Sequence, residues 1–150
     1  SLADYVDEIV KSFQEISKKK FVVNSYQNFN PVSITKSIEI VYGLRNFIGN
    51  ANKFAKSKVF IDIKSDSHYT EIIIEDDGEG YPRDVLTKIG EPYIKSFKSS
   101  VKSQSGLGLG IFIGKTLLEK NYANILCKNS KTKSGAEVSI KWKNKDLLSI

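Results

Sequence analysis

The sequence contains few of the residues from which redox, metal and membrane sites are built. Its 150 residues include one cysteine, Cys127, which excludes an internal disulfide and fits a reducing compartment. Its one histidine, His68, excludes a histidine-rich metal site. Apolar runs reach about four residues, against the roughly 20 that cross a bilayer, so we expect a soluble domain. The acidic first residues also predict no secretory signal peptide, because such peptides begin with a basic segment.

Arginine is scarce as well, although the chain is basic. It has 23 lysine and arginine residues against 17 aspartate and glutamate residues, a formal net charge of +6, but only Arg45 and Arg83 are arginines. Proteins that read duplex DNA favour arginine for base contacts, so a nucleic-acid partner is not expected. Lysines cluster weakly at residues 18–20, 95–102 and 141–145. We interpret most of them as a solvated surface, and a basic rim around an anionic ligand is the alternative.

The length and the hydrophobic content predict one domain with a single core. Apolar residues spaced three and four apart predict helices, and short runs bounded by turn residues predict strands. The predicted helices cover residues 3–17, 34–55, 83–89 and 107–120, and the predicted strands cover residues 20–25, 58–64, 69–76, 123–129 and 136–142. Residues 90–105 have little periodicity and predict a mobile loop. Helices segregated from a mostly antiparallel sheet indicate a two-layer α/β sandwich.

The predicted helix over residues 34–55, with Ser33 as its N-cap, carries an apolar and a polar stripe. The stripe expected to face the core consists of Ile34, Ile38, Val41, Leu44, Ile48, Ala51 and Ala55. Asn46 and Asn50 are four residues apart and share another face, with Lys53 about one turn further on. An amide oxygen is a hard ligand suited to Mg²⁺, and lysine offers a point charge to phosphates. A solvated helix face is the alternative interpretation.

A glycine turn follows the predicted strand over residues 69–76. Gly78 and Gly80 allow positive φ angles and a close approach of a flat ligand. A carboxylate at the buried end of the strand, Asp76, can accept a hydrogen bond from an exocyclic amino group. An EF-hand calcium loop is excluded, because the two glycines occupy positions where it needs carboxylates. A plain turn remains the alternative.

A second glycine-rich segment, Gly106, Leu107, Gly108, Leu109 and Gly110, opens the predicted helix over residues 107–120. Backbone N–H groups at such a helix start form an anion site, which the helix dipole strengthens. A P-loop is excluded because its first glycine would stand where the chain has leucine, and the dinucleotide fingerprint lacks its third glycine. Lys115 is therefore interpreted as a solvated helix lysine.

In their order and spacing, these motifs resemble those of the Bergerat-fold ATPases, the group of gyrase, Hsp90, MutL and the histidine kinases. The resemblance runs from about residue 37 to 142 and is greatest to histidine kinase catalytic domains. Residues 46–54 (NFIGNANKF) resemble the N box, residues 76–81 (DDGEGY) the G1 box, residues 89–93 (IGEPY) the F box and residues 106–110 (GLGLG) the G2 box. Asp77 stands where the G1 box more usually has asparagine, and Gly90 replaces the first F-box phenylalanine. Several segments are most similar to the RegB/PrrB type of redox-responsive sensor kinase.

The resemblance implies a Bergerat fold with helices on one face of the sheet and a mobile ATP lid. It implies that Asp76 reads adenine, that Asn50 binds Mg²⁺, and that Asn46 and Lys53 face the phosphates. Asn50 and Lys53 would be the catalytic pair.

The same resemblance assigns the remaining residues of the ATP site. Gly78 and Gly80 would shape the floor of the purine pocket. The lid and the second glycine segment would contribute Tyr93, Lys95, Gly106, Leu107, Gly108, Leu109 and Gly110. Tyr93 would pack the lid against the nucleotide, and Lys95 stands where the family often has an arginine. The glycines would hinge the lid and present N–H groups to the phosphates.

The implied reaction is transfer of the γ-phosphoryl group of ATP to a histidine, with ATP and Mg²⁺ as cofactors. The acceptor is absent here, because His68 lies in a predicted hairpin turn and is expected at the surface. We therefore expect residues 1–18 to be the tail of a dimerisation helix or a linker, residues 19–145 the catalytic domain and residues 146–150 a C-terminal tail. Such a domain would bind ATP without phosphorylating itself.

The implied partners are the protein's own dimerisation domain and a response regulator, without nucleic acid and without direct membrane contact. The parent protein would be a homodimeric inner-membrane sensor with this domain in the cytoplasm. An anti-sigma-factor serine kinase or binding module stays open, because it shares the three motifs: the asparagine-bearing helix, the glycine turn and the second glycine-rich segment. A nucleic-acid-binding domain rests on charge alone. Cys127 is interpreted as a buried strand thiol rather than a redox sensor.

Overall fold

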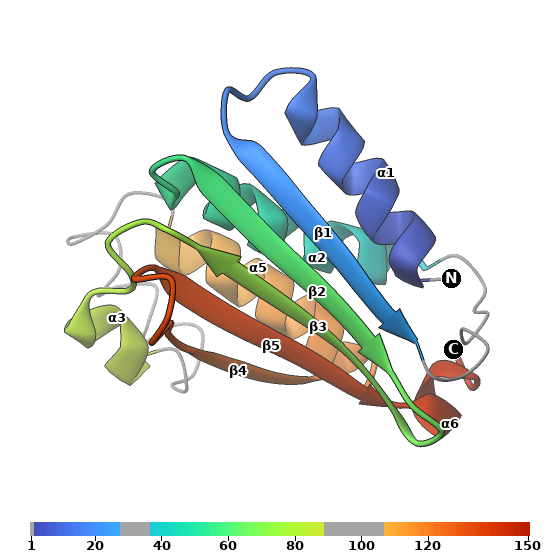
Figure 1. The fold of residues 1–150 in the computed structure, drawn as a ribbon. Helices are drawn as coiled ribbons and strands as arrows, with labels where there is room; N and C mark the ends of the chain where they lie inside the picture. The colour runs from blue at the N-terminus through green and yellow to red at the C-terminus, as the bar shows by residue number, and fades with distance from the viewer. Residues whose placement is uncertain (1, 28–36, 89–106) are drawn as a thin grey trace.

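The computed structural model describes residues 2–27, 37–88 and 107–150. The helices are α1 (Leu2–Gln14), α2 (Ile38–Phe54), α3 (Arg83–Lys88), α5 (Leu107–Lys120) and α6 (Asn144–Leu147). The strands are β1 (Lys20–Gln27), β2 (Lys58–Ser65), β3 (Tyr69–Asp76), β4 (Asn124–Asn129) and β5 (Ala136–Lys143). Figure 1 shows α2 and α5 side by side against one face of the sheet, with α1 at the β1 edge.

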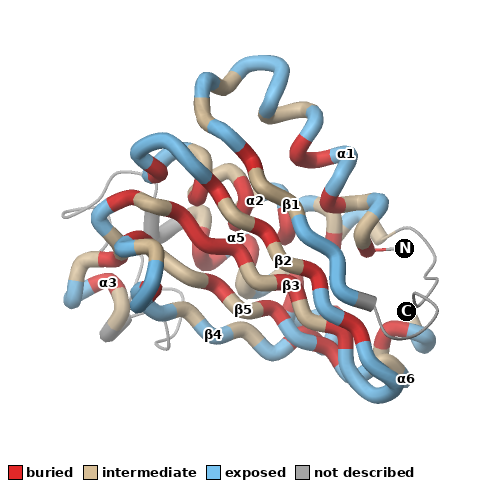
Figure 2. Tube along the Cα trace, in the orientation of Figure 1, coloured by how far each residue is buried: buried red, intermediate tan, exposed pale blue. Residues whose placement is uncertain are grey.

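The five strands form one mixed sheet in the order β1-β2-β3-β5-β4. β1 pairs with β2 in parallel and the other pairs are antiparallel. Burial alternates along β2, where Val59, Ile61 and Ile63 are buried while Lys58 and Lys64 are exposed. One face of the sheet therefore packs on the helices and the other meets water, as Figure 2 shows. The predicted two-layer sandwich is confirmed.

Helix α2 begins later than its apolar pattern predicts. Its N-cap is Ser37, whose hydroxyl accepts a hydrogen bond from the Ile40 N–H at 3.3 Å, so Ser33 as the cap was wrong. Ile38, which was expected in the core, is 67% exposed, and Ile40 and Phe47 are buried instead. The buried stripe of α2 consists of Ile40, Gly43, Leu44, Phe47, Ile48 and Ala51.

Helices α2 and α5 approach closely through two glycines. A Cβ atom on Gly43 would lie 2.6 Å from Cγ of Leu118, and one on Gly114 would lie 2.8 Å from the Phe47 ring. The absence of side chains at both positions lets the helix backbones meet. This contact places the first turn of α5 beside the polar stripe of α2.

Both ends of the described chain contribute to the core. Helix α1 buries Val6 and Ile9, and the short α6, for which no helix was predicted, buries Leu147. Four residues are too few for a periodic pattern, so α6 has no signal in the sequence. Among the described residues, no helix combines the length and apolar character that a membrane span requires.

Candidate functional site

A cavity of about 260 Å³ opens between α2, the end of β3 and the start of β5. This volume is slightly below the range of about 300–1,000 Å³ that is usual for small-molecule pockets. The cavity is lined by Phe47, Asn50, Ala51, Phe54, Lys56, Ile74, Asp76, Glu79, Gly80, Tyr81, Pro82, Ala136 and Val138. The structure therefore brings Asn50 and Asp76 together, although they come from different elements.

Asp76 is the last residue of β3 and supplies the buried carboxylate of the cavity. Its side chain is 3% exposed, and its Oδ1 accepts hydrogen bonds from the N–H groups of Gly78 at 2.8 Å and Ala136 at 3.3 Å. Burial raises the pKa of Asp76, the negative charge of Asp77 adds to this, and the two hydrogen bonds oppose it. A carboxylate held in an apolar cavity is a strong and directed hydrogen-bond acceptor.

Two glycines of the predicted turn are required by geometry. A Cβ atom on Gly78 would overlap the carbonyl oxygen of Phe54, at the end of α2. Gly80 has a φ of +84°, and a Cβ there would lie 2.7 Å from Oδ1 of Asn129. The turn thus packs against both α2 and β4 with no room for side chains.

Asn129 and Gly135 also support the turn, and neither was predicted from the sequence. Asn129 Oδ1 accepts a hydrogen bond from the Tyr81 N–H at 2.7 Å, and its Nδ2 donates to the Tyr81 carbonyl at 3.2 Å. A Cβ on Gly135 would overlap Asp76. No local pattern points to these residues, because they reach the site only through the pairing of β4, β5 and β3.

Asn50 lies where α2 meets the glycine-rich start of α5. A Cβ on Gly110 would lie 3.1 Å from Oδ1 of Asn50 and 3.2 Å from its Nδ2. The Nδ2 atom is buried, and it has no hydrogen-bond acceptor among the described residues. A buried amide without a partner is costly, and it marks a place for a bound polar group.

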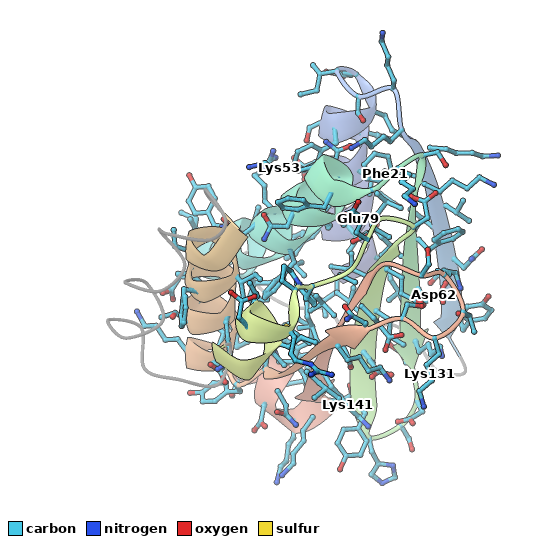
Figure 3. All side chains as sticks on the ribbon, turned by 90° about the vertical axis from the view of Figure 1, so that its left-hand side faces the viewer. Phe21, Lys53, Asp62, Glu79, Lys131 and Lys141 are labelled. Atoms are coloured by element: carbon cyan, nitrogen blue, oxygen red, sulfur yellow. The ribbon has the colours of Figure 1, made fainter. Side chains whose placement is uncertain are left out.

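Asn46 and Lys53 do not line this cavity. Asn46 is half-buried and donates from Nδ2 to the Tyr42 carbonyl of its own helix at 2.8 Å. Lys53 is exposed, with its ammonium 5.3 Å from the centre of the Phe54 ring, and Figure 3 labels it on the α2 side of the molecule. Of the three α2 residues predicted for the ATP site, only Asn50, the expected Mg²⁺ ligand, is in the wall of the cavity.

The glycine-rich segment is described in part. Helix α5 begins at Leu107, as predicted, and runs to Lys120. Its first backbone N–H groups have no intrahelical acceptor, and Gly110 in its first turn lies beside the Asn50 side chain. Several of the predicted features lie outside the described residues. They are Ser33, the F box with Gly90, the loop over residues 90–105, Tyr93, Lys95 and Gly106.

The expected basic rim is small in the described part of the chain. Lys56 is the one lysine there that lines the cavity. Lys131 and Lys141 are exposed and do not line the cavity, so those lysines belong to the solvated surface. Lys115 pairs with Glu119 at 3.0 Å along α5 and does not line the cavity, but its side chain is only 22% exposed, so it is less solvated than predicted.

Tyr81 connects the cavity to Cys127 on β4. Burial raises the pKa of the Tyr81 hydroxyl, which is hydrogen-bonded to the Cys127 thiol. Burial likewise raises the pKa of Cys127 to about 11, against a lowering by that hydrogen bond. Because its pKa is raised, the thiol is neutral near pH 7. Cys127 is half-buried and acts as a packing group. His68 is exposed, as expected.

Comparison with known sequences agrees with this geometry. Residues 35–146 match the family model described as histidine kinase-, DNA gyrase B-, and HSP90-like ATPase. The sensor histidine kinase RegB of Cereibacter sphaeroides is 42% identical over 65% of this chain, and the sporulation kinase A of Bacillus subtilis is 30% identical over 58%. This chain covers 22% and 13% of those two proteins. The predicted similarity to RegB-type kinases is confirmed.

Solved structures share the fold. The catalytic domain of histidine kinase ThkA superposes with a TM-score of 0.73 at 18% identity, covering 95% of this chain and 94% of that one. The mycobacterial sensor histidine kinase MprB superposes with a TM-score of 0.69 at 19% identity, covering 95% and 93%. The chain belongs to the family of histidine kinase-, DNA gyrase B-, and HSP90-like ATPases, and within it is a catalytic domain of the histidine kinase type.

Proposed function

We propose that this chain binds ATP with Mg²⁺ in the cavity between α2, β3 and β5, as the catalytic domain of a sensor histidine kinase. The observation that carries this proposal is the presence of Asp76 and Asn50 in the wall of one cavity, beside the start of α5. An adenine nucleotide requires a hydrogen-bond acceptor for its amino group at one end and a group such as a helix start for its phosphates at the other. Family membership supports the same conclusion.

The adenine ring would lie in the apolar part of the cavity. Phe47, Ile74 and Val138 provide flat and aliphatic walls around Asp76. The carboxylate would accept a hydrogen bond from the exocyclic amino group of adenine. A site that relies on such a bond rejects purines without the group, because the buried carboxylate would then lose its partner.

The phosphates and Mg²⁺ would lie at the other end, between Asn50 and α5. The amide of Asn50 fits this role, because its oxygen is a hard ligand and its Nδ2 lacks an acceptor among the described residues. Bound Mg²⁺ would neutralise charge on the phosphate oxygens. Asn46 and Lys53 remain proposed phosphate contacts, and Lys53 has a long flexible side chain with which to reach them.

In the parent protein, the γ-phosphoryl group would pass to a histidine of a dimerisation domain and from there to a response regulator. Residues 19–145 would form the ATP-binding unit, with residues 1–18 connecting it to that domain and residues 146–150 as its end. The proposed parent is a homodimeric inner-membrane sensor whose catalytic domains lie in the cytoplasm. This assignment rests on the similarity to sensor histidine kinases.

Thermal unfolding with ADP and Mg²⁺ tests the nucleotide site. Ligand at a hundred times its dissociation constant should add about 2.7 kcal/mol of stability, which raises the Tm of a domain this size by roughly 5–10 °C. Asp76→Asn should abolish the rise, and Asn50→Ala should remove its Mg²⁺-dependent part. Asp62→Asn is the matched control, because Asp62 lies on the solvent face of the sheet (Figure 3). No rise in the wild type would refute the proposal.

Phosphotransfer needs the acceptor in a second protein. The chain should label a separately prepared histidine-bearing dimerisation domain of a RegB-type kinase when γ-labelled ATP and Mg²⁺ are present. The label should be acid-labile, as phosphohistidine is, and should be absent with the Asp76→Asn chain. ATP binding without any transfer to a histidine would overturn the kinase assignment while leaving the nucleotide site intact.

A further inference from the structure

Asp77 has a dense set of hydrogen bonds that the ATP site does not use directly. Its Oδ1 accepts from the backbone N–H groups of Lys56 at 2.8 Å, Ser57 at 3.0 Å and Lys58 at 3.2 Å. Its Oδ2 accepts from the Ser57 hydroxyl at 2.7 Å and again from the Lys58 N–H at 3.2 Å. Burial alone would raise the pKa of Asp77, but these donors outweigh it and hold the pKa well below its usual range. These donors therefore favour the ionised form of Asp77.

The donors belong to the connection between α2 and β2, which borders the cavity. Phe54 and Lys56 both line it, and the Phe54 carbonyl stands where a side chain on Gly78 would be. The Asp77 side chain therefore binds the end of α2 to the turn that follows Asp76. A second contact joins the same two segments, because the Asp77 N–H donates a hydrogen bond to the Lys58 carbonyl at 3.3 Å.

Asp76 and Asp77 are adjacent, but their side chains contact different parts of the protein. Asp76 faces the cavity while Asp77 is bonded to the α2–β2 connection. Their charges repel, and the charge of Asp77 contributes to the raised pKa of Asp76. With Asp77 held by its donors, the backbone at Gly78 is fixed, and its N–H holds Oδ1 of Asp76 in place.

We propose that Asp77 is a positioning residue that sets the preference of the site for adenine, by fixing the turn from which Asp76 reads the amino group. This inference rests on the proposed ATP function and adds a residue to it. Discrimination between purines depends on the exact position of a buried acceptor, whereas general nucleotide affinity also draws on the cavity walls and α5. Loss of Asp77 should therefore reduce adenine preference more than it reduces binding of other purines.

Calorimetric titration of the full chain with ADP and with IDP, each with Mg²⁺, tests the proposal. IDP lacks the exocyclic amino group. The wild type should bind ADP at least about tenfold more tightly than IDP, a ratio that a single hydrogen bond to a charged group can supply. Asp77→Ala should lower that ratio severalfold, chiefly through weaker ADP binding. Asp77→Asn should restore most of it, because one amide oxygen can accept the same three N–H bonds.

Three outcomes would overturn the proposal. The first is an ADP-to-IDP affinity ratio for Asp77→Ala equal to that of the wild type. The second is a ratio for Asp77→Asn as low as that for Asp77→Ala. The third is a wild type that shows no preference for ADP over IDP. If Asp77→Ala does not fold, Ser57→Ala removes only the hydroxyl donor, and it should lower the ratio by about two- to threefold. An unchanged ADP-to-IDP ratio in Ser57→Ala would also overturn the proposal. A wild type that binds neither nucleotide would refute the proposed function itself, which separates the two failures.

Discussion

The buried carboxylate of Asp76 lowers the stability of the folded protein, a cost that a binding function would explain. Because burial raises its pKa, the unfolded chain loses this proton at a lower pH than the folded protein does. The resulting penalty is absent below about pH 3.9, the ordinary value for aspartate, and grows as the pH rises through the folded pKa. A buried charge kept at such a cost is typical of binding sites.

We therefore expect Asp76→Asn to unfold at a higher urea concentration than the wild type at pH 7.5 without ligand. The asparagine Oδ1 can still accept from Gly78 and Ala136, so the turn should be kept. The difference should shrink as the pH falls toward 4, where the wild-type carboxyl becomes protonated. Urea titrations at pH 4.5 and 7.5 measure it, and a less stable variant at pH 7.5 would contradict the cause given for the pKa.

At the scale of elements, the contact between α2 and α5 decides where the two halves of the site meet. The glycines at the crossing let the helices approach, and this approach brings Gly110 to Asn50. Alanine is ordinarily the better helix residue by about 1 kcal/mol. At this crossing, the cost of overpacking should exceed that gain.

Gly43→Ala should lower the free energy of unfolding by about 1–3 kcal/mol, because its methyl group would meet the Leu118 side chain at 2.6 Å. Gly49→Ala on the same helix is the control. There the nearest atom is Cζ at the end of the Phe13 ring, at 3.3 Å, which can move aside. Denaturant unfolding should show a clearly larger loss for Gly43→Ala. Equal effects of the two changes would mean that the crossing is not tightly packed.

At the scale of the molecule, α1 belongs to the same core as the sheet and α2. Val6 and Ile9 are almost completely buried in one cluster with the strand residues. The connection after α1 also reaches α2, since Lys19 Nζ donates to the carbonyls of Asn52 and Lys53 at its end. A cation at that position is favourable for the helix dipole.

Ile9→Ala should therefore cost about 2–5 kcal/mol of stability, as a large-to-small change in a core does. Ile16→Ala is the matched control, because Ile16 is 83% exposed and lies just beyond the same helix. Thermal and urea unfolding of both variants measure the difference. If Ile9→Ala were as mild as Ile16→Ala, α1 would be a detachable segment rather than part of the core.

Most elements and all the motifs could be placed from local patterns in the amino-acid sequence. Helix α5 and strand β3 run over the predicted residues, because periodicity and glycine turns are local properties that a short window contains. The family was inferred from the resemblance of the motifs in their order and spacing, and those motifs contain the cavity residues Asn50, Asp76 and Gly80. Where a local rule allowed several answers, as at the start of α2, the prediction was wrong by four residues, from Ser33 to Ser37.

Which polar residues meet could be seen only in the folded arrangement of the chain. Asn46 and Asn50 look alike in the sequence, but one bonds its own helix and the other faces α5. Asn129 reaches the turn by strand pairing, and Asp77 reaches the connection 56–58 at a separation of about 20 residues. Such contacts depend on how distant segments pack together, and no local pattern records that packing.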